Sequence, residues 1–443
     1  MQNDVHMIKH EVKQYIVKNI FASLGLSMYV IVDTLFIALA AGSLGLTTLN
    51  LVLPVFNFFN SIGLLFGIGG SALYSLNKVY HPEKVKDYFS QMLLFCALLG
   101  ISFAIIANLF PHQILHFLGA NEQTIDLATM YLRIIACSGP LFMCNYVAIN
   151  FVRNDGNPKL TMLATLIETI FVVIVDWILI FGLGLKMEGA ALATLFAPLM
   201  SLFVLTHHRK FKQRTLSLRF VWPKAKTLLA AAKIGIPSFF TEMSTGVSIF
   251  AFNWILLKLA GNEAIAAYGV IANIAIVVLA LFNGVALGVQ PIASREFGKK
   301  KFANVRAAIL LGLKVSLSLA IVAYFVLLFF KYPIISAFNA EHDPSLVSYA
   351  ASGMPIYFVS VFFANFNIVI MMSLAAINRP QGAFLMSLGR GYIILLLALF
   401  ILAHFFGLSG VWAAVPCAEA IVAVLGFYLL YQAIFNFRKE ELL

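Results

Sequence analysis

Residues 266–293 read AAYGVIANIAIVVLALFNGVALGVQPIA, a run of 28 residues without a charged side chain. A helix that crosses a hydrocarbon core of roughly 30 Å needs about 20 apolar residues, so this stretch predicts a transmembrane helix. The whole chain has the same character, because 61% of its 443 residues are hydrophobic and only 11% are charged. A soluble domain is roughly 45–50% apolar and about 25% charged. The sequence therefore predicts a membrane protein with little mass outside the bilayer.

Apolar runs of this kind recur along the chain, separated by short polar connections. We therefore expect an all-α membrane protein with about twelve transmembrane helices. The expected spans are 16–40, 50–76, 89–110, 128–150, 160–182, 189–206, 231–257, 266–293, 305–330, 347–376, 383–406 and 410–435.

The basic residues indicate how these helices are oriented. Of the 30 Lys and Arg residues, all but Arg133, Lys186, Lys258 and Lys331 lie in or beside the connections on the same side as the N-terminus. Basic residues concentrate in cytoplasmic loops. We therefore expect a multi-pass protein of the cell membrane with both termini in the cytoplasm. The same topology explains the net charge of +11, and we expect no nucleic-acid partner.

The longest polar stretch divides the spans six and six. We expect a cytoplasmic N-terminus at 1–15, an N-terminal lobe at 16–206, a basic linker at 207–230, a C-terminal lobe at 231–435 and a cytoplasmic tail at 436–443. The N-terminal stretch lacks a small-residue cleavage site, so we expect the first span to be retained. His207 and His208 lie in the linker, and we assign them no function.

Matching loops suggest that the two lobes are repeats. The loop at 153–159, RNDGNPK, resembles NRPQG at 378–382, and Phe181-Gly182-Leu183 resembles Phe406-Gly407-Leu408. Two six-helix halves that both enter from the cytoplasm are parallel repeats, as in transporters that work by alternating access. Chance similarity among glycine-rich turns is the alternative.

Carboxylic acids inside the spans are the strongest functional signal. Each costs about 2.5–3.5 kcal/mol to place near the bilayer centre, so such groups usually face a cavity. Asp33 and Asp176 each lie about 15 residues beyond the cytoplasmic start of a span, which places both about 22–24 Å deep. If they face one cavity, their mutual repulsion favours binding of a proton or a cation. The alternative is that each is a solitary hydrogen-bonded side chain.

Three further acids have comparable settings. Glu242 follows the helix breaker Gly235-Ile236-Pro237, and Glu419 follows Pro416. A proline kink frees backbone carbonyls and opens a bundle, so both acids are expected to face a cavity. Glu168 lies eight residues before Asp176 and is either its partner or simply close to the cytoplasm.

Motifs for catalysis or nucleotide binding are not found in the sequence. We therefore expect a protein that is not an enzyme and that has no cofactor. An ion gradient of H⁺ or Na⁺ is the expected energy source. Na⁺ could bind at Asp33 and Asp176 or at Glu242, and we expect no other metal site.

With these features, the chain resembles the multidrug and toxic compound extrusion (MATE) family, in particular its bacterial multidrug-efflux branch. The resemblance covers nearly the whole length. It rests on the segments YVIVDT at 29–34, RNDGNPK at 153–159, FGLG at 181–184, GAALAT at 189–194, GIPS at 235–238 and GVW at 410–412, together with Asp176 and Glu242.

The resemblance implies two six-helix lobes arranged in a V, which export organic cations in exchange for H⁺ or Na⁺. It also implies a cation site formed by Asp33, Tyr29, Asp176 and Thr194, with Glu242 as the coupling acid of the other lobe. Two departures from the family pattern affect this site. Val172 stands where the family often has Asn, and the usual early proline of the first span is absent around Ala22.

The expected function is therefore a secondary active exporter of cationic drugs or dyes, working as a monomer in the bilayer. One alternative is a flippase for lipid-linked saccharides of the same superfamily, which handles anionic carriers and would need a basic cavity. A membrane-embedded enzyme is a second alternative, but no histidine pairs convincingly with the acids.

Overall fold

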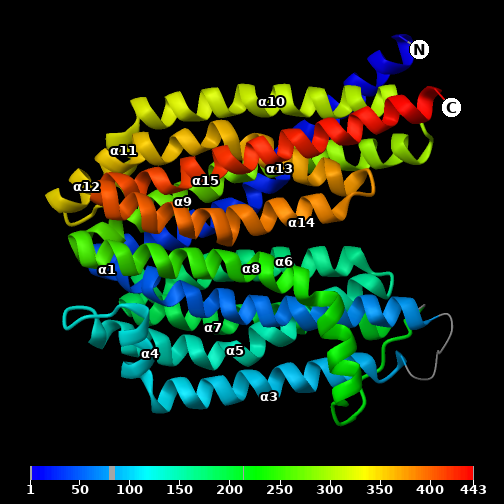
Figure 1. Cartoon of the computed structure of the whole chain (residues 1–443). Coiled ribbons are helices and arrows are strands. Elements are labelled where there is room, and N and C mark those ends of the chain that lie inside the picture. The colour runs from blue at the N-terminus through cyan, green and yellow to red at the C-terminus, as the bar shows by residue number, and fades with distance from the viewer. Residues whose placement is uncertain (1, 79–84, 213, 443) are drawn as a thin grey trace. The chain divides into compact units, whose positions relative to one another are not determined.

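The computed structural model describes residues 2–78, 85–212 and 214–442, and these ranges contain no strand. The α-helices are α1 (Gln2–Lys78), α3 (Tyr88–Leu109), α4 (Pro111–Leu118), α5 (Ile125–Asn154), α6 (Pro158–Trp177), α7 (Lys186–Leu205), α8 (Ala225–Ala260), α9 (Asn262–Gly298), α10 (Phe302–Phe329), α11 (Lys331–Ala337), α12 (Pro344–Tyr357), α13 (Val361–Ala376), α14 (Pro380–Leu388) and α15 (Ile394–Leu442) (Figure 1). The π-helical turns are η1 (Ile178–Gly182) and η4 (Gly389–Ile393), and the 3₁₀ turns are η2 (Thr206–Lys210) and η3 (Phe358–Ser360). The predicted all-α class is confirmed.

The two longest helices, α1 and α15, each contain a sharp reversal at a glycine. Gly42 has φ 59° and Gly407 has φ 56°, a left-handed conformation that glycine adopts without steric cost. A Cβ atom on Gly410 would lie 1.9 Å from the carbonyl oxygen of Leu402. Eight residues of straight helix span about 12 Å, so the chain must fold back between these two positions.

These reversals settle the number of membrane crossings. Ten helical segments of the described ranges are long and apolar enough to cross a membrane. Two of them, Ile31–Ser75 and Pro380–Ile434, contain the reversals at Gly42 and Gly407. Each of these two helices therefore supplies two crossings, and the twelve predicted spans are confirmed.

The chain packs as two compact units, which we describe separately. Unit 1 comprises Met1–Thr34 with Ile255–Leu443, and unit 2 comprises Leu35–Trp254. The first part of α1 thus packs with the C-terminal helices, and most of α8 packs with the N-terminal helices. This division by contacts differs from the predicted lobes, whose boundaries were placed at the polar linker that divides the spans six and six and stay a prediction.

In unit 1, polar contacts join α1 to α9. Thr34 donates a hydrogen bond of 3.0 Å to the Oδ1 atom of Asn273, in the interior of the unit. Near the other end of α9, the Arg295 guanidinium forms two hydrogen bonds with the Glu11 carboxylate, at 2.8 and 2.7 Å. Helices α10, α12 and α13 pack around α9, and α15 packs on α13. Helix α9 is therefore the centre of this unit, which explains why its sequence is apolar all round.

In unit 2, α8 packs on the second half of α1 through two glycines. A Cβ atom on Gly69 would lie 2.0 Å from the carbonyl oxygen of Ala231, and one on Gly235 would lie 2.0 Å from that of Leu65. Small residues at such positions let transmembrane helices approach closely. Helix α5 packs between α3 and α7, and α7 also contacts α6.

Replacing Gly235 by Ala is expected to destabilise unit 2. The added methyl group cannot fit at 2.0 Å from a backbone oxygen, so the helices must separate at a cost of about 1–3 kcal/mol. The midpoint of thermal unfolding in detergent measures the effect. Gly298→Ala is the matched control, because a Cβ there meets nothing within 4 Å. Equal midpoints for the two variants would contradict the close packing.

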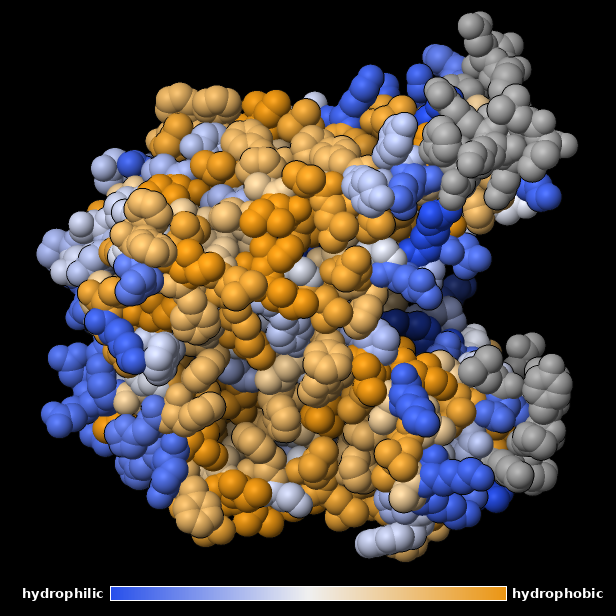
Figure 2. Space-filling model, in the orientation of Figure 1, coloured by the Kyte–Doolittle hydropathy of each residue, from blue (hydrophilic) through white to orange (hydrophobic). Residues whose placement is uncertain are grey.

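Each unit also has the surface expected of a membrane protein. Hydrophobic residues cover the middle of the visible face of each unit, and hydrophilic residues gather toward its ends (Figure 2). Many large apolar side chains are exposed on the spans, among them Phe203, Ile174 and Phe400. Exposed apolar side chains of this kind are suited to contact with hydrocarbon.

Candidate functional site

The acids and hydroxyl predicted for the N-terminal site lie on three helices. Asp176, on α6, has a solvent exposure of 0%. Thr194 is half-buried on α7, the helix that packs on α6. Both residues belong to unit 2. Helix packing thus places these two candidates on adjacent helices of one unit.

Asp33 and Tyr29 lie on the part of α1 that belongs to unit 1. Asp33 is half-buried, and its neighbour Thr34 is the residue that bonds to Asn273. The side chain of Tyr29 lies outside the described part of the structure. Because Asp33 and Asp176 belong to different units, their joint cation site stays a prediction.

Glu168 is held by an amide. The Nδ2 atom of Asn145, on α5, donates to both carboxylate oxygens of Glu168, at 3.2 and 3.0 Å. No basic side chain of the described residues pairs with this carboxylate. Glu168 is thus a half-buried acid within α6 whose hydrogen-bond partner is an amide and not a base.

Glu242 has a similar partner. It is half-buried on α8, about one turn beyond Pro237, and the amide of Asn60 on α1 lies near its carboxyl group. Both residues belong to unit 2. This acid too therefore has an amide neighbour inside the helical bundle.

Glu419 differs from these acids because it is ion-paired. It is 6% exposed on α15, and the Arg390 guanidinium donates to its Oε1 atom at 2.5 and 3.1 Å. The Nδ2 atom of Asn367 donates to Oε2 at 2.6 Å. We counted Arg390 with the cytoplasmic loops, and this was wrong. Arg390 lies in the π-helical turn η4, within a span, and neutralises Glu419.

The Glu168 and Glu419 clusters occupy corresponding places in the two repeats. Asn145 and Asn367 each lie 13 residues before the proline that opens the next helix, and Glu168 and Arg390 each lie ten residues after it. The repeat therefore carries an acid in one half and a base in the other. Only the second half also supplies a counter-charge, which is Glu419.

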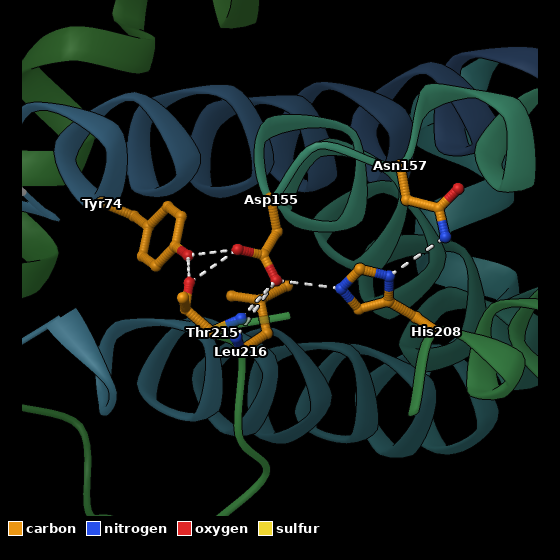
Figure 3. Close-up of polar contacts among 6 residues, drawn as sticks. All are labelled: Tyr74, Asp155, Asn157, His208, Thr215 and Leu216. Carbon is orange, nitrogen blue, oxygen red and sulfur yellow. Dashed lines mark hydrogen bonds and ion pairs between the residues drawn. The ribbon is translucent and has the colours of Figure 1, made fainter. Parts of the chain in front are cut away.

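Asp155 is the centre of a third cluster, in unit 2, where its carboxylate meets His208, Thr215 and Leu216 of the linker (Figure 3). It is 4% exposed, in the loop between α5 and α6. The hydroxyl groups of Tyr74 and Thr215 each donate to its Oδ1 atom at 2.6 Å. The backbone N–H groups of Thr215 and Leu216 donate to Oδ2 at 2.9 and 3.2 Å, and His208 Nε2 lies 2.9 Å from the same atom.

The Asp155 cluster fixes the linker to the membrane helices. Burial opposes ionisation of Asp155, but hydrogen bonds from Thr215, Tyr74 and His208 outweigh it and hold the pKa of Asp155 well below its usual range. His208 contributes to this structural cluster, because its ring is buried between Asp155 and the Nδ2 atom of Asn157. The polar loop around Asp155 thus positions the segment that leads into α8.

Replacing Asp155 by Asn is expected to lower the free energy of unfolding by about 1–3 kcal/mol, because several buried donors lose a charged acceptor. Since the folded-state pKa is depressed, the stabilisation is present at neutral pH and is lost only as pH falls through that pKa. The midpoint of thermal unfolding at pH 7 measures the change. Asp126→Asn, on an exposed carboxylate of α5, is the control. Equal midpoints would refute a structural role for the cluster.

The chemistry available inside the spans is that of oxygen ligands and proton acceptors. Within the described ranges, no group of three or more His, Cys, Asp and Glu residues could hold a metal ion. Glu168 and Glu242 carry amide partners and can take up a proton or attract a cation. The half-buried acids of unit 2 are therefore candidate sites for a proton or a cation.

Comparison with known proteins agrees with this organisation. The sequence model of a family described as MatE matches residues 19–178 and residues 237–397. Two matched segments of nearly equal length are consistent with the repeat inferred from the loops. The Multidrug export protein MepA of Staphylococcus saprophyticus is 27% identical over 411 residues, which cover 91% of this chain and 89% of that protein.

Solved structures share the fold. An inward-facing multidrug resistance MATE family transporter of the MOP superfamily gives a TM-score of 0.84 at 19% identity, and the match covers 94% of this chain and 96% of that chain. The MATE multidrug transporter DinF-BH, solved in complex with rhodamine 6G, gives a TM-score of 0.75 at 26% identity over 96% of this chain and 95% of that chain. The helical arrangement is therefore an established one.

Proposed function

Because the chain belongs to the MatE family, we propose that it is a secondary active multidrug exporter of the cell membrane. It moves cationic, lipophilic organic compounds outward in exchange for H⁺ or Na⁺ that moves inward. The multidrug export of its MepA relatives and the complex of DinF-BH with rhodamine 6G support this substrate class. The protein works as a monomer in the lipid bilayer and needs no cofactor other than the coupling ion.

The observation that carries this proposal is the unneutralised acid within the spans. Glu168 and Glu242 have amide partners, whereas Glu419 is paired with a base. Keeping a carboxylate inside a membrane is unfavourable unless it serves a cavity or an ion. Acids that bind the organic cation in one step and the coupling ion in the other would serve an ion in this way.

Competition for the same carboxylates couples the two fluxes. A lipophilic cation is stabilised by Asp33, Asp176 or Glu242 while the acid is ionised. Binding of H⁺ or Na⁺ removes that stabilisation and releases the cation on the outer side. A coupling ion shifts the equilibrium between the cation-bound and the cation-free protein only as far as it binds these two states differently. It binds a carboxylate that the organic cation has left empty and not one that the cation occupies, and this supplies the difference.

The charge distribution also weighs against a flippase for anionic lipid carriers. A cavity for such carriers needs unpaired basic groups within the spans, whereas Arg390 forms an ion pair with Glu419. The acids of unit 2 would repel a pyrophosphate group. Among the described residues, the one buried histidine, His208, belongs to the Asp155 cluster beside the linker and not to the acids of the spans, which favours a transporter over a membrane-embedded enzyme.

Efflux of rhodamine 6G from proteoliposomes tests the proposal. We expect an imposed H⁺ or Na⁺ gradient to drive the dye against its own gradient, and an ionophore for that ion to stop it. Measuring the two gradients in turn also identifies the coupling ion. Dye movement that responds to neither gradient would refute antiport.

A further inference from the structure

A basic groove lies in unit 1 between the first turns of α1 and the first turns of α10, on the side predicted to face the cytoplasm. It encloses about 410 Å³. Its floor includes Ala303 and Ala307, which are four residues apart on one face of α10 and leave room between the helices. The groove is distinct from the acids discussed above, and both of its walls belong to the same unit.

Positive charge dominates this groove. Its lining contains no acidic residue but six basic ones, His6, Lys9, His10, Lys13, Arg306 and Lys314. None of these side chains has an ion-pair or hydrogen-bond partner among the described residues. By contrast, the Glu11 carboxylate on α1 and the Arg295 guanidinium on α9 form an ion pair with each other. Like charges in one groove repel, so the groove is complementary to an anion, and none of the described residues supplies one.

The position of Lys314 along α10 indicates which kind of anion fits the groove. Lys314 lies 12 residues beyond the start of α10, about 18 Å along the helix, and is surrounded by apolar sequence. A lysine at this depth extends its ammonium group toward the headgroup region. Leu310 and Leu311 line the groove between Lys314 and its mouth, and Leu310 is 45% exposed. The groove thus combines cationic groups with an apolar wall.

This combination matches a phospholipid better than a soluble anion. The phosphate can lie among the basic side chains while an acyl chain covers Leu310. Inorganic phosphate has no part that would use the apolar wall. Basic pockets between helices on the cytoplasmic side are also where anionic headgroups bind membrane proteins. We propose that the groove between α1 and α10 binds the phosphate-bearing headgroup of an anionic phospholipid from the cytoplasmic leaflet.

Native mass spectrometry of the purified full-length protein tests this proposal. The detergent-solubilised protein is titrated with phosphatidylglycerol and, separately, with phosphatidylcholine, which has no net charge. We expect phosphatidylglycerol to bind at least tenfold more tightly. The triple variant Lys9→Gln, Lys13→Gln and Arg306→Gln is expected to lose at least tenfold in affinity for phosphatidylglycerol while its affinity for phosphatidylcholine is unchanged.

A second triple variant controls for net charge. Arg209→Gln, Lys210→Gln and Lys212→Gln remove the same charge from the exposed linker, outside the groove. This variant is expected to bind phosphatidylglycerol as the parent does. Equal binding of the two lipids, or equal losses in the two triple variants, would overturn the proposal.

Inorganic phosphate separates a lipid site from a soluble-anion site. We expect millimolar phosphate to leave phosphatidylglycerol binding unchanged within about twofold. Displacement of the lipid at that concentration would show that the groove takes a free anion and would overturn the assignment to a lipid. The thermal unfolding midpoint of lipid-free protein, expected to be equal in both triple variants, verifies that each variant is folded.

Discussion

Replacing Asp176 by Asn is expected to abolish ion-driven export of a cationic dye while the protein still folds. Asn has nearly the same size but cannot ionise, so the fully buried position would hold neither a proton nor a cation. We expect the initial rate of rhodamine 6G efflux from proteoliposomes to fall at least about tenfold, which corresponds to about 1.4 kcal/mol. Asp126→Asn makes the same change at an exposed carboxylate and is the control.

The companion variant Asp33→Asn tests whether the two acids act together. If they form one site, the double variant should be no slower than either single variant, because residues that act as a unit are not additive. Losses that simply multiply would show that the acids act separately. Parental transport with unchanged ion dependence in Asp176→Asn would rule out this acid as the exchanging group.

Replacing Arg390 by Met is expected to destabilise the protein by about 3–5 kcal/mol, because it leaves Glu419 ionised and unpaired inside the spans. Replacing the pair by apolar residues of similar volume is often neutral, so Arg390→Met with Glu419→Leu is expected to recover most of the loss. The thermal unfolding midpoint in detergent measures both variants. Recovery in the double variant is the specific signature of a neutralised pair.

Glu168→Gln provides the contrast at the corresponding place in the other half. Its carboxylate has an amide partner and no base, so the neutral amide should keep the contact with Asn145 and the unfolding midpoint should change little. Arg390→Met with the parental midpoint would contradict the ion pair. A large loss of stability in Glu168→Gln would contradict the difference between the two halves.

Hydropathy was sufficient to predict the all-α class and the number of spans in this chain. The twelve spans follow from uninterrupted apolar runs, and the tight reversals at Gly42 and Gly407 lie where the sequence placed connections. The packing partners of the helices were harder to predict from the sequence. The first part of α1 packs with α9, and α8 packs with α1 through Gly69 and Gly235, and neither pairing leaves a trace in hydropathy.

The polar clusters show why the candidate site was only partly predictable. Glu168, Glu242 and Glu419 were found because acids are conspicuous in apolar sequence, but hydropathy does not show which side chains of other helices and turns lie next to them. Arg390 lies close to a basic loop in the sequence and was counted with it. Aligning Pro158 with Pro380 would have shown that Arg390 occupies the position in its repeat that Glu168 occupies in the other, since each lies ten residues after its proline. His208 was missed because a polar linker gives no sign of burial.

The affinity of the purified protein for a lipophilic cation, measured in lipid nanodiscs as pH and Na⁺ are varied, tests most directly whether the intramembrane carboxylates exchange one cation for another. We predict that the dissociation constant for rhodamine 6G rises as the concentration of the coupling ion rises, and that Asp176→Asn removes this dependence. A dissociation constant that is independent of both H⁺ and Na⁺ would contradict exchange at the carboxylates within the spans.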